Sequence, residues 1–205
     1  GRMSDPDTIV AAALSSLSRN NDTGDLAGKH TLVTSGPTVE PIDAVRYISN
    51  YSSGRQGHAI ASALAKRGAR VTLVSGPVHI PDPPGVEMVH VKTAEEMLAA
   101  CKAALPADIA ICAAAVADWR AQIQSKGKIK KRSGHQTPPP LLLKENPDIL
   151  AQLAAHSERP RLVIGFAAEA NDLQRNGIEK LRRKGCDWIV ANQLNLSFSG
   201  KTVFG

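Results

Sequence analysis

The fold is set by HTLVT (30–34), SSGRQGHAIASALAKRG (52–68) and RVTLV (70–74), which read as a strand, a helix and a second strand. The outer segments are rich in β-branched residues, as strands are. In the middle segment Ile60 and Leu64 recur at helical spacing, with Ser52 or Ser53 as the expected N-cap and Gly68 as the expected stop. This order is typical of a parallel βαβ unit.

The same alternation continues in both directions. Further strands are predicted at 86–91, 108–113, 162–166 and 188–191, and further helices at 7–18, 93–104, 147–155 and 172–184. Thr93 and Glu96 have the spacing of a capping box, and Asn146 followed by Pro147 is typical of a helix start. We therefore predict an α/β fold: a Rossmann-like three-layer parallel sheet with helices on both faces, plus a flap or arm segment around 120–145.

Ligands of such sheets bind beyond the carboxyl ends of the strands. Two segments there have features of phosphate binding: Ser35, Gly36 and Thr38 after the first strand, and Ser52, Ser53 and Gly54 at a helix start. Backbone N–H groups and the positive end of a helix dipole attract anions. An ordinary tight turn and a serine-capped helix are the alternatives.

Other residues of these loops suit a nucleotide. Asp118 follows a run of small residues and can accept a hydrogen bond from an amine or hydroxyl, whereas a solvated loop acid is the alternative. Phe166 can pack on a base or simply in the core. Lys180 and Lys184 share one helix face, although cations are favoured at a helix C-terminus in any case.

Dinucleotide binding is the rival function on this fold, and the sequence does not favour it. The first strand is followed by Pro37 rather than by a GxGxxG loop, and the second ends at Val74-Ser75 without an acid for a ribose hydroxyl. A GxxxxGK[ST] phosphate loop is also missing. A nicotinamide-dependent reductase remains the second hypothesis, tested by NADPH binding.

The positive charge is local. The net charge of the 205 residues is +6, and five cations fall in one window: Lys126, Lys128, Lys130, Lys131 and Arg132. This window suits a flap over a polyphosphate, with an exposed basic loop as the alternative. Aromatic residues make up only 3%, too few to stack single-stranded nucleic acid, so a nucleic-acid-binding module is the third and least favoured hypothesis.

Cysteine content and hydropathy bound the compartment. Cys101, Cys112 and Cys186 are scattered without a CxxC pair, so we expect buried, unreactive thiols in a reducing cytoplasm. No apolar run approaches the length of a membrane helix, and no signal peptide is visible, so no membrane association is expected. The histidines lack metal-ligand spacing, so the metal ligands stay unknown.

Six motifs together resemble one family. They are TSGPTVEPID (34–43) with VRYISN (45–50) and SSG (52–54), AAVADW (114–119), KIKK (128–131), NPDI (146–149), GFAAE (165–169) and AN (191–192). Their order is similar to that of bacterial phosphopantothenoylcysteine synthetases, the ligase domain of a bifunctional coenzyme A biosynthesis protein. The similarity covers residues 28–198. Tyr51, Arg55-Gln56 and Trp119 depart from the usual pattern of the family.

The resemblance implies a reaction. CTP, with Mg²⁺, activates the carboxylate of phosphopantothenate as an acyl-cytidylate, releasing pyrophosphate. L-cysteine then displaces CMP. The implied catalytic residues are Asn50, Lys128 and Arg46, and the implied nucleotide-binding residues are Ala114, Asp118, Lys128, Asn146, Pro147, Asp148, Ile149, Phe166, Lys180 and Lys184.

The resemblance also implies a domain organisation. Residues 1–27 are expected to be a remnant of the preceding decarboxylase domain of the same polypeptide and a linker, and residues 28–205 the synthetase domain. FMN is expected only in that decarboxylase domain. A homodimer is expected, with the substrate site completed across its interface, and the family usually continues beyond residue 205 with a further strand.

Overall fold

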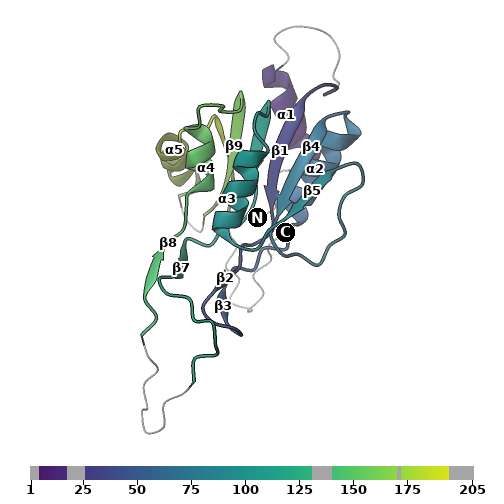
Figure 1. Cartoon of the computed structure of the whole chain (residues 1–205). Coiled ribbons are helices and arrows are strands. Elements are labelled where there is room, and N and C mark those ends of the chain that lie inside the picture. Colours follow the sequence, from purple (N-terminus) through teal and green to yellow (C-terminus); the bar gives the residue numbers. More distant parts are fainter. Residues whose placement is uncertain (1–4, 18–25, 131–139, 170–171, 194–205) are drawn as a thin grey trace.

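A six-stranded parallel sheet forms the centre of the molecule (Figure 1). The computed structural model describes residues 5–17, 26–130, 140–169 and 172–193. Across the sheet the strands are β10 (Trp188–Gln193), β9 (Leu162–Glu169), β6 (Ile109–Cys112), β1 (His30–Ser35), β4 (Arg70–Ser75) and β5 (Glu87–His90). Every neighbouring pair is parallel. The predicted strands are thus confirmed, with β9 and β10 extending beyond the predicted ends.

The described part of the chain contains five helices, which cover the two faces of the sheet: α1 (Pro6–Leu17) and α2 (Arg55–Lys66) on one, and α3 (Ala94–Ala103), α4 (Ile149–Ala154) and α5 (Leu173–Lys184) on the other. Alternate residues of each strand feed the two resulting cores. In β1, for example, Val33 belongs to the core formed with Ile60 and Leu64 of α2, whereas Leu32 belongs to the core formed with Met97 of α3. The predicted three-layer arrangement is confirmed.

The order of the strands creates a switch point. From β1 the chain runs outward to β4 and β5, then crosses back to β6 on the other side of β1. The loops after β1 and β6 therefore leave the sheet side by side and diverge. In doubly wound sheets, the crevice at such a reversal is where ligands bind.

Two helix starts differ from the prediction. The N-cap of α2 is Gly54 in the left-handed conformation, with φ 75°, rather than Ser52 or Ser53. The serine hydroxyls instead accept from the Gly54 and Arg55 amides at 3.4 Å. The N-cap of α4 is Asp148, whose carboxylate accepts from the Ala151 amide at 3.0 Å. Asn146 is not the cap because its side chain is bonded elsewhere, as described below.

Four short strands were missed by the sequence patterns. β2 (Glu40–Pro41) pairs with β3 (Tyr47–Ile48), and β7 (Trp119–Ala121) pairs with β8 (Leu143–Glu145), both antiparallel. Both pairs lie at the same end of the molecule, beyond the sheet (Figure 1). The β7–β8 pair forms the base of the predicted arm, of which residues 131–139 lie outside the described part.

The N-terminal helix packs on the domain. The predicted helix at 7–18 is confirmed as α1, which lies against α2 and buries Ile9 and Val10. The proposed division at residue 27 stays a prediction, but α1 shares the hydrophobic core of the sheet. Among the described residues, no helix has the length and apolar character needed to cross a membrane.

Candidate functional site

The loops after β1 and β6 are joined by hydrogen bonds at the switch point. The Ala115 amide donates to the Gly36 carbonyl at 2.9 Å, and Pro37 forms a parallel bridge with Ala115. The buried Thr38 hydroxyl accepts from the Ala117 amide at 2.9 Å. The Thr38 side chain therefore holds the loop after β1 and the loop after β6 together.

Asn50 connects this junction to the segment before α2. Its Nδ2 donates to the Ala115 carbonyl, and its Oδ1 accepts from the Ser52 amide at 3.1 Å. The neighbouring Ser49 hydroxyl donates to the Thr38 carbonyl at 2.8 Å. The predicted residues Asn50, Thr38, Ser52 and the Ala114–Ala115 loop thus come together at the switch point.

The first turn of α2 approaches β1 closely. The buried Ser35 hydroxyl donates to the Gly54 carbonyl at 2.8 Å and lies 2.9 Å from His58 Nδ1. A Cβ on Gly57 would lie 2.4 Å from Ser35 Oγ, so only glycine fits there. Because the Ser35 hydroxyl is used internally, a phosphate at this turn would meet backbone amides together with the Ser52 and Ser53 hydroxyls.

His58 was missed by the sequence patterns and belongs to this packing. Burial lowers the pKa of His58, although the Gly54 carbonyl opposes that shift, so the ring is neutral at pH 7. Among the described residues, its Nε2 has no hydrogen-bond partner. No motif indicated this role, because it follows from the close approach of α2 to β1.

Asn146 holds the base of the arm to the β6 loop. Its side-chain Nδ2 donates to the Ala117 carbonyl at 2.7 Å, and its backbone N–H donates to the Asp118 carbonyl at 2.8 Å. Arg120 donates to Asn146 Oδ1 at 2.7 Å and to Glu95 of α3 at 2.6 Å. The carboxylate of Asp118 is left exposed to solvent beside this junction.

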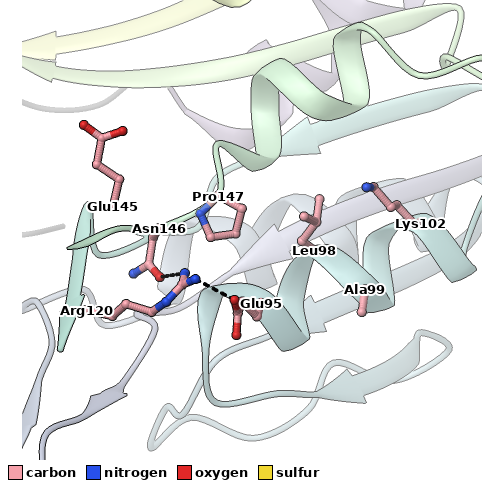
Figure 2. A pocket seen from close by; sticks show the side chains of 8 residues that line it. All are labelled: Glu95, Leu98, Ala99, Lys102, Arg120, Glu145, Asn146 and Pro147. Carbon is pink, nitrogen blue, oxygen red and sulfur yellow. Dashed lines mark hydrogen bonds and ion pairs between the residues drawn. The ribbon is translucent and has the colours of Figure 1, made fainter. Parts of the chain in front are cut away.

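A cleft of about 470 Å³ lies between α3 and the arm. Figure 2 shows the Arg120 guanidinium between Asn146 and Glu95, with the Glu145 side chain directed away from them. The lining residues are Glu95, Leu98, Ala99, Lys102, Arg120, Glu145, Asn146 and Pro147. The cleft therefore includes two predicted nucleotide-binding residues and adds Arg120, which no motif had indicated.

Two further predicted residues form an ion pair. Lys184 of α5 donates to Asp148 Oδ2 at the start of α4. Burial would raise the pKa of Asp148, but hydrogen bonds from Lys184 and the Ala151 amide outweigh it, so the pKa lies below its usual range. Lys180 precedes Lys184 by one helical turn on the same helix.

Phe166 is half-buried in β9 and packs against the core that lies under α1 and α2.

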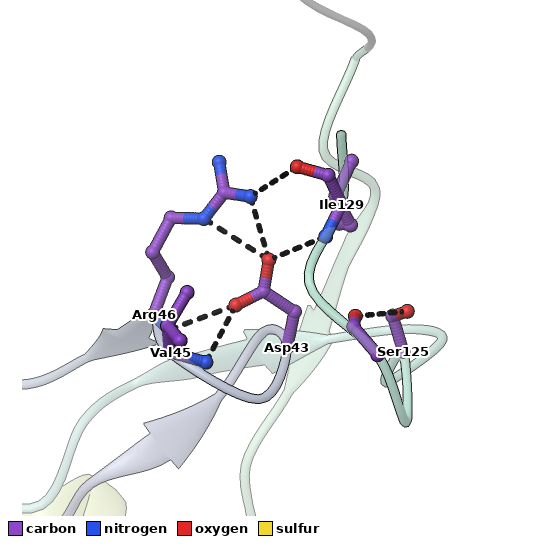
Figure 3. A network of polar contacts seen from close by, with 6 residues as sticks. Asp43, Val45, Arg46, Ser125 and Ile129 are labelled. Carbon is purple, nitrogen blue, oxygen red and sulfur yellow. Dashed lines mark hydrogen bonds and ion pairs between the residues drawn. The ribbon is translucent and has the colours of Figure 1, made fainter. Parts of the chain in front are cut away.

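The described part of the basic window, residues 126–130, which we call the basic segment, is hydrogen-bonded to the β2–β3 hairpin (Figure 3). Arg46 forms an ion pair with the buried Asp43 at 2.7 Å and donates to the Ile129 carbonyl at 2.7 Å. Lys128 precedes Ile129 and is exposed. Asp43 was another residue missed by the sequence analysis, although an aspartate at the start of a tight turn is a recognisable signal.

The described residues contain no group of three or more His, Cys, Asp or Glu side chains arranged to hold a metal ion. Mg²⁺ usually binds proteins through one or two carboxylates together with substrate phosphates, and does not need such a group.

These features define a class: a doubly wound α/β domain whose polar loops are joined by hydrogen bonds at the switch point. Comparison with known proteins gives the family. The chain belongs to the family described as the DNA/pantothenate metabolism flavoprotein C-terminal domain, which matches residues 26–203. The predicted relationship is therefore confirmed.

Full-length relatives are about twice as long as the chain. The chain is 47% identical over 201 residues to the coenzyme A biosynthesis bifunctional protein CoaBC of Escherichia coli strain K12, and the match covers 98% of the chain and 49% of that protein. The CoaBC protein of Mycobacterium bovis is 45% identical over 204 residues, covering 94% and 48%. The chain thus spans about half the length of the curated relatives it matches.

A solved structure has the same fold. The crystal structure of the C-terminal domain of a CoaBC protein superposes with a TM-score of 0.71 at 39% identity. The match covers 82% of this chain and 78% of that one. The α/β fold is therefore shared with a domain of a coenzyme A biosynthesis protein.

Proposed function

We propose that this domain is a CTP-dependent ligase that joins phosphopantothenate to L-cysteine in coenzyme A biosynthesis. The observation that carries the proposal is the junction at the switch point. There Asn50, the loop after β6 and the start of α2 are held together by hydrogen bonds. The relatives named for coenzyme A biosynthesis support the choice of substrates.

The reactants are anionic, and the cations of the domain suit them. A triphosphate, a substrate phosphate and a carboxylate must meet against their mutual repulsion, so positioning and charge neutralisation dominate the catalysis. Lys128, Lys180 and Lys184 are the lysines proposed to face the nucleotide. The start of α2, which has no side-chain cap, offers amides for a phosphate, with Ser52 and Ser53 beside it.

The proposed reaction has two balanced steps. A carboxylate oxygen of phosphopantothenate bonds to the α-phosphorus of CTP while the bond to pyrophosphate breaks. The amine nitrogen of cysteine then bonds to the acyl carbon, loses a proton to solvent and displaces CMP. Asn50 is proposed to orient the acyl-cytidylate for the second step, and Lys128 to neutralise charge in the first.

The nucleotide and metal contacts are also proposals. Ala114, Asp118, Phe166 and the 146–149 turn are proposed to hold the base and ribose, and Mg²⁺ is proposed to arrive with CTP. Magnesium would supply charge neutralisation at the phosphates. All three cysteines are free thiols, with Cys101 and Cys186 buried and Cys112 partly buried, which fits the reducing cytoplasm proposed for the protein.

Exposed apolar side chains support the proposed homodimer. They lie on the β2–β3 hairpin and at the base of the arm, and include Val45, Tyr47, Trp119, Ile123 and Leu142. Clusters of this kind are typical of protein–protein contacts. We propose that the arm and hairpin pair with those of a second copy, and that further domains of the polypeptide supply the decarboxylation.

Two variants test the proposed division of work in an assay of pyrophosphate release and cysteine-dependent turnover. Lys128→Ala is expected to slow pyrophosphate release itself by about 100-fold, since it removes a transition-state charge contact. Asn50→Ala is expected to keep pyrophosphate release while losing turnover with cysteine.

Lys66→Ala is the matched control, because Lys66 is exposed in the last turn of α2, at the opposite end of the sheet. It should retain the wild-type rate. Full activity in Lys128→Ala would remove Lys128 from the mechanism, and normal turnover in Asn50→Ala would contradict the role assigned to Asn50.

A further inference from the structure

The peptide groups on both sides of Ile129 are held by the β2–β3 hairpin. The Ile129 amide donates to Asp43 Oδ2 at 3.0 Å, and the Ile129 carbonyl accepts from Arg46 Nη2 at 2.7 Å (Figure 3). A third bond lies nearby, from the Ser125 amide to the Ile42 carbonyl at 3.0 Å. The exposed Lys128 and Lys130 flank the point at which the backbone is fixed.

Asp43 is the centre of this contact. Its side chain is fully buried, and its Oδ1 accepts from the amides of Val45 and Arg46 at 2.9 and 2.8 Å. Its Oδ2 accepts from two donors among the described residues, the Ile129 amide and the Arg46 guanidinium. One oxygen therefore shapes the hairpin turn, while the other connects the hairpin to the basic segment.

The charge state suits this arrangement. The hydrogen bond from the Ile129 amide lowers the pKa of Asp43 most, followed by that from Val45; burial works in the opposite direction, and Arg46 lowers the pKa further. The pKa of Asp43 lies well below its usual range, so the carboxylate is ionised at neutral pH. Ionised acceptors make stronger hydrogen bonds than neutral ones.

We infer that Asp43 is a positioning residue, which fixes the backbone at Ile129 so that Lys128 is held at the proposed nucleotide site. Neither the sequence motifs nor the contacts of the crevice assign this role to Asp43. The inference rests on the proposed function for its kinetic consequence. The contact itself can be measured independently of activity.

Asp43→Asn separates the two roles of the side chain. An asparagine Oδ1 can still accept from Val45 and Arg46 and keep the turn, whereas its Nδ2 is a donor facing the donor amide of Ile129. Ile129→Pro removes the same hydrogen bond from the other partner, because proline lacks an amide hydrogen. Ile129 lies in a surface segment, so this variant keeps the inference testable if Asp43→Asn fails to fold.

The first measurement is amide hydrogen exchange by NMR. In Asp43→Asn, exchange at Ile129 is expected to accelerate at least about 10-fold, since its hydrogen bond is lost, while the Val45 and Arg46 amides keep their protection. Asp187→Asn is the matched control, because Asp187 Oδ2 likewise accepts from a backbone amide, that of Val163, and from an arginine, Arg159. Asp187 precedes β10 and lies at the opposite end of the sheet. The control should leave Ile129 unchanged.

The second measurement is a double-mutant cycle on the rate of pyrophosphate release. Asp43→Asn and Ile129→Pro are each expected to lower kcat by about 10- to 100-fold, the cost of a misplaced catalytic group. In a protein that already carries Lys128→Ala, each is expected to lower kcat by a further factor of less than about two, because the effects of substitutions that act through one another are not additive.

The inference would be overturned if the Ile129 amide exchanged at the wild-type rate in Asp43→Asn. It would also be overturned if the reduction in kcat of the double variant equalled the product of the reductions caused by Asp43→Asn and Lys128→Ala alone. If the wild-type domain released no pyrophosphate at all, the proposed function would fail. The exchange measurement would then still decide whether Asp43 fixes the segment.

Discussion

Asn50, Asn146 and Asp148 are polar residues of the candidate site whose side chains are already hydrogen-bonded within the protein. Each uses two atoms: Asn50 binds Ala115 and Ser52, Asn146 binds Ala117 and Arg120, and Asp148 binds Ala151 and Lys184. Groups fixed in this way need little rearrangement when charge develops in a reaction. At the residue scale, the site is therefore built from side chains that position backbone.

The thiols give a prediction at the same scale. Burial raises the pKa of all three cysteines, that of Cys112 to about 12. The thiolate is the reactive form, so the native protein is expected to react with iodoacetamide at pH 8 at least about 10-fold more slowly than a free thiol. Mass spectrometry of the alkylated protein measures this.

The denatured chain is the control and should take up three labels, one for each cysteine. Rapid labelling of any cysteine in the native protein would show that the corresponding segment opens readily, and would contradict the closed packing of β6, α3 and the region before β10.

Sequence patterns identified the loops of the crevice but not what each side chain does. Ser35 and Thr38 were predicted to bind phosphate, yet both side chains are buried and hydrogen-bonded inside the protein. Their partners, Gly54 and Ala117, lie 19 and 79 residues away. Such pairings depend on how distant loops meet, which neither spacing nor composition records. His58, Arg120 and the contact of Asp43 with Ile129 were missed for the same reason, although the local turn at Asp43 is visible in the sequence.

At the scale of elements, the six long strands and five helices could be predicted because hydrophobic periodicity and caps mark them. The Thr93–Glu96 capping box and the left-handed Gly185 after α5 are both present. The pairs β2–β3 and β7–β8 have strands of only two or three residues, too short to show a period of two. Their formation depends on contacts with neighbouring loops.

Glycines give a prediction at this scale. Gly177 lies inside α5, and an added Cβ would make an ordinary contact of 3.7 Å with Ala191. Gly177→Ala is therefore expected to stabilise the protein by about 0.5–1 kcal/mol, the helix preference of alanine over glycine. Thermal unfolding followed by circular dichroism is the measurement.

Gly165→Ala is the contrasting variant. Its Cβ would lie 2.4 Å from Leu150 Cδ2 and 2.9 Å from Ile189 Cδ1, so overpacking is expected to destabilise the protein by about 1–3 kcal/mol. If the two variants shifted the melting temperature in the same direction, the packing of α4, α5 and β10 on β9 would be described wrongly.

At the scale of the whole molecule, the parts proposed to bind the substrates gather at one end of the sheet. The switch point, the hairpin and the base of the arm all lie there (Figure 1). Five cations of the chain, whose net charge is +6, fall between residues 126 and 132, and this window includes the segment that the hairpin binds at Ile129. Charge gathered in one short segment suits a local anion site better than it suits a nucleic-acid-binding surface. Cations are thereby collected where a polyanionic substrate is proposed to bind.

The proposed dimer gives the prediction at this scale. Light scattering is expected to find twice the 21.7 kDa of one chain. Leu142→Asp, which places a charge on the exposed apolar surface beside β8, is expected to give monomers. Ile178→Asp is the control, because Ile178 is an exposed apolar residue of α5, away from the arm. A wild-type monomer, or a dimer broken only by Ile178→Asp, would contradict the proposed interface.

The central claim is tested most directly by pyrophosphate release from the wild-type domain with phosphopantothenate and Mg²⁺, comparing CTP with ATP. With CTP and no cysteine, we predict release of about one pyrophosphate per active site, because the acyl-cytidylate stays bound; added cysteine should bring continuous turnover. ATP should support a rate at least about 100-fold lower, as expected for a site that hydrogen-bonds one base. Absence of pyrophosphate with CTP, or equal rates with the two nucleotides, would contradict the account.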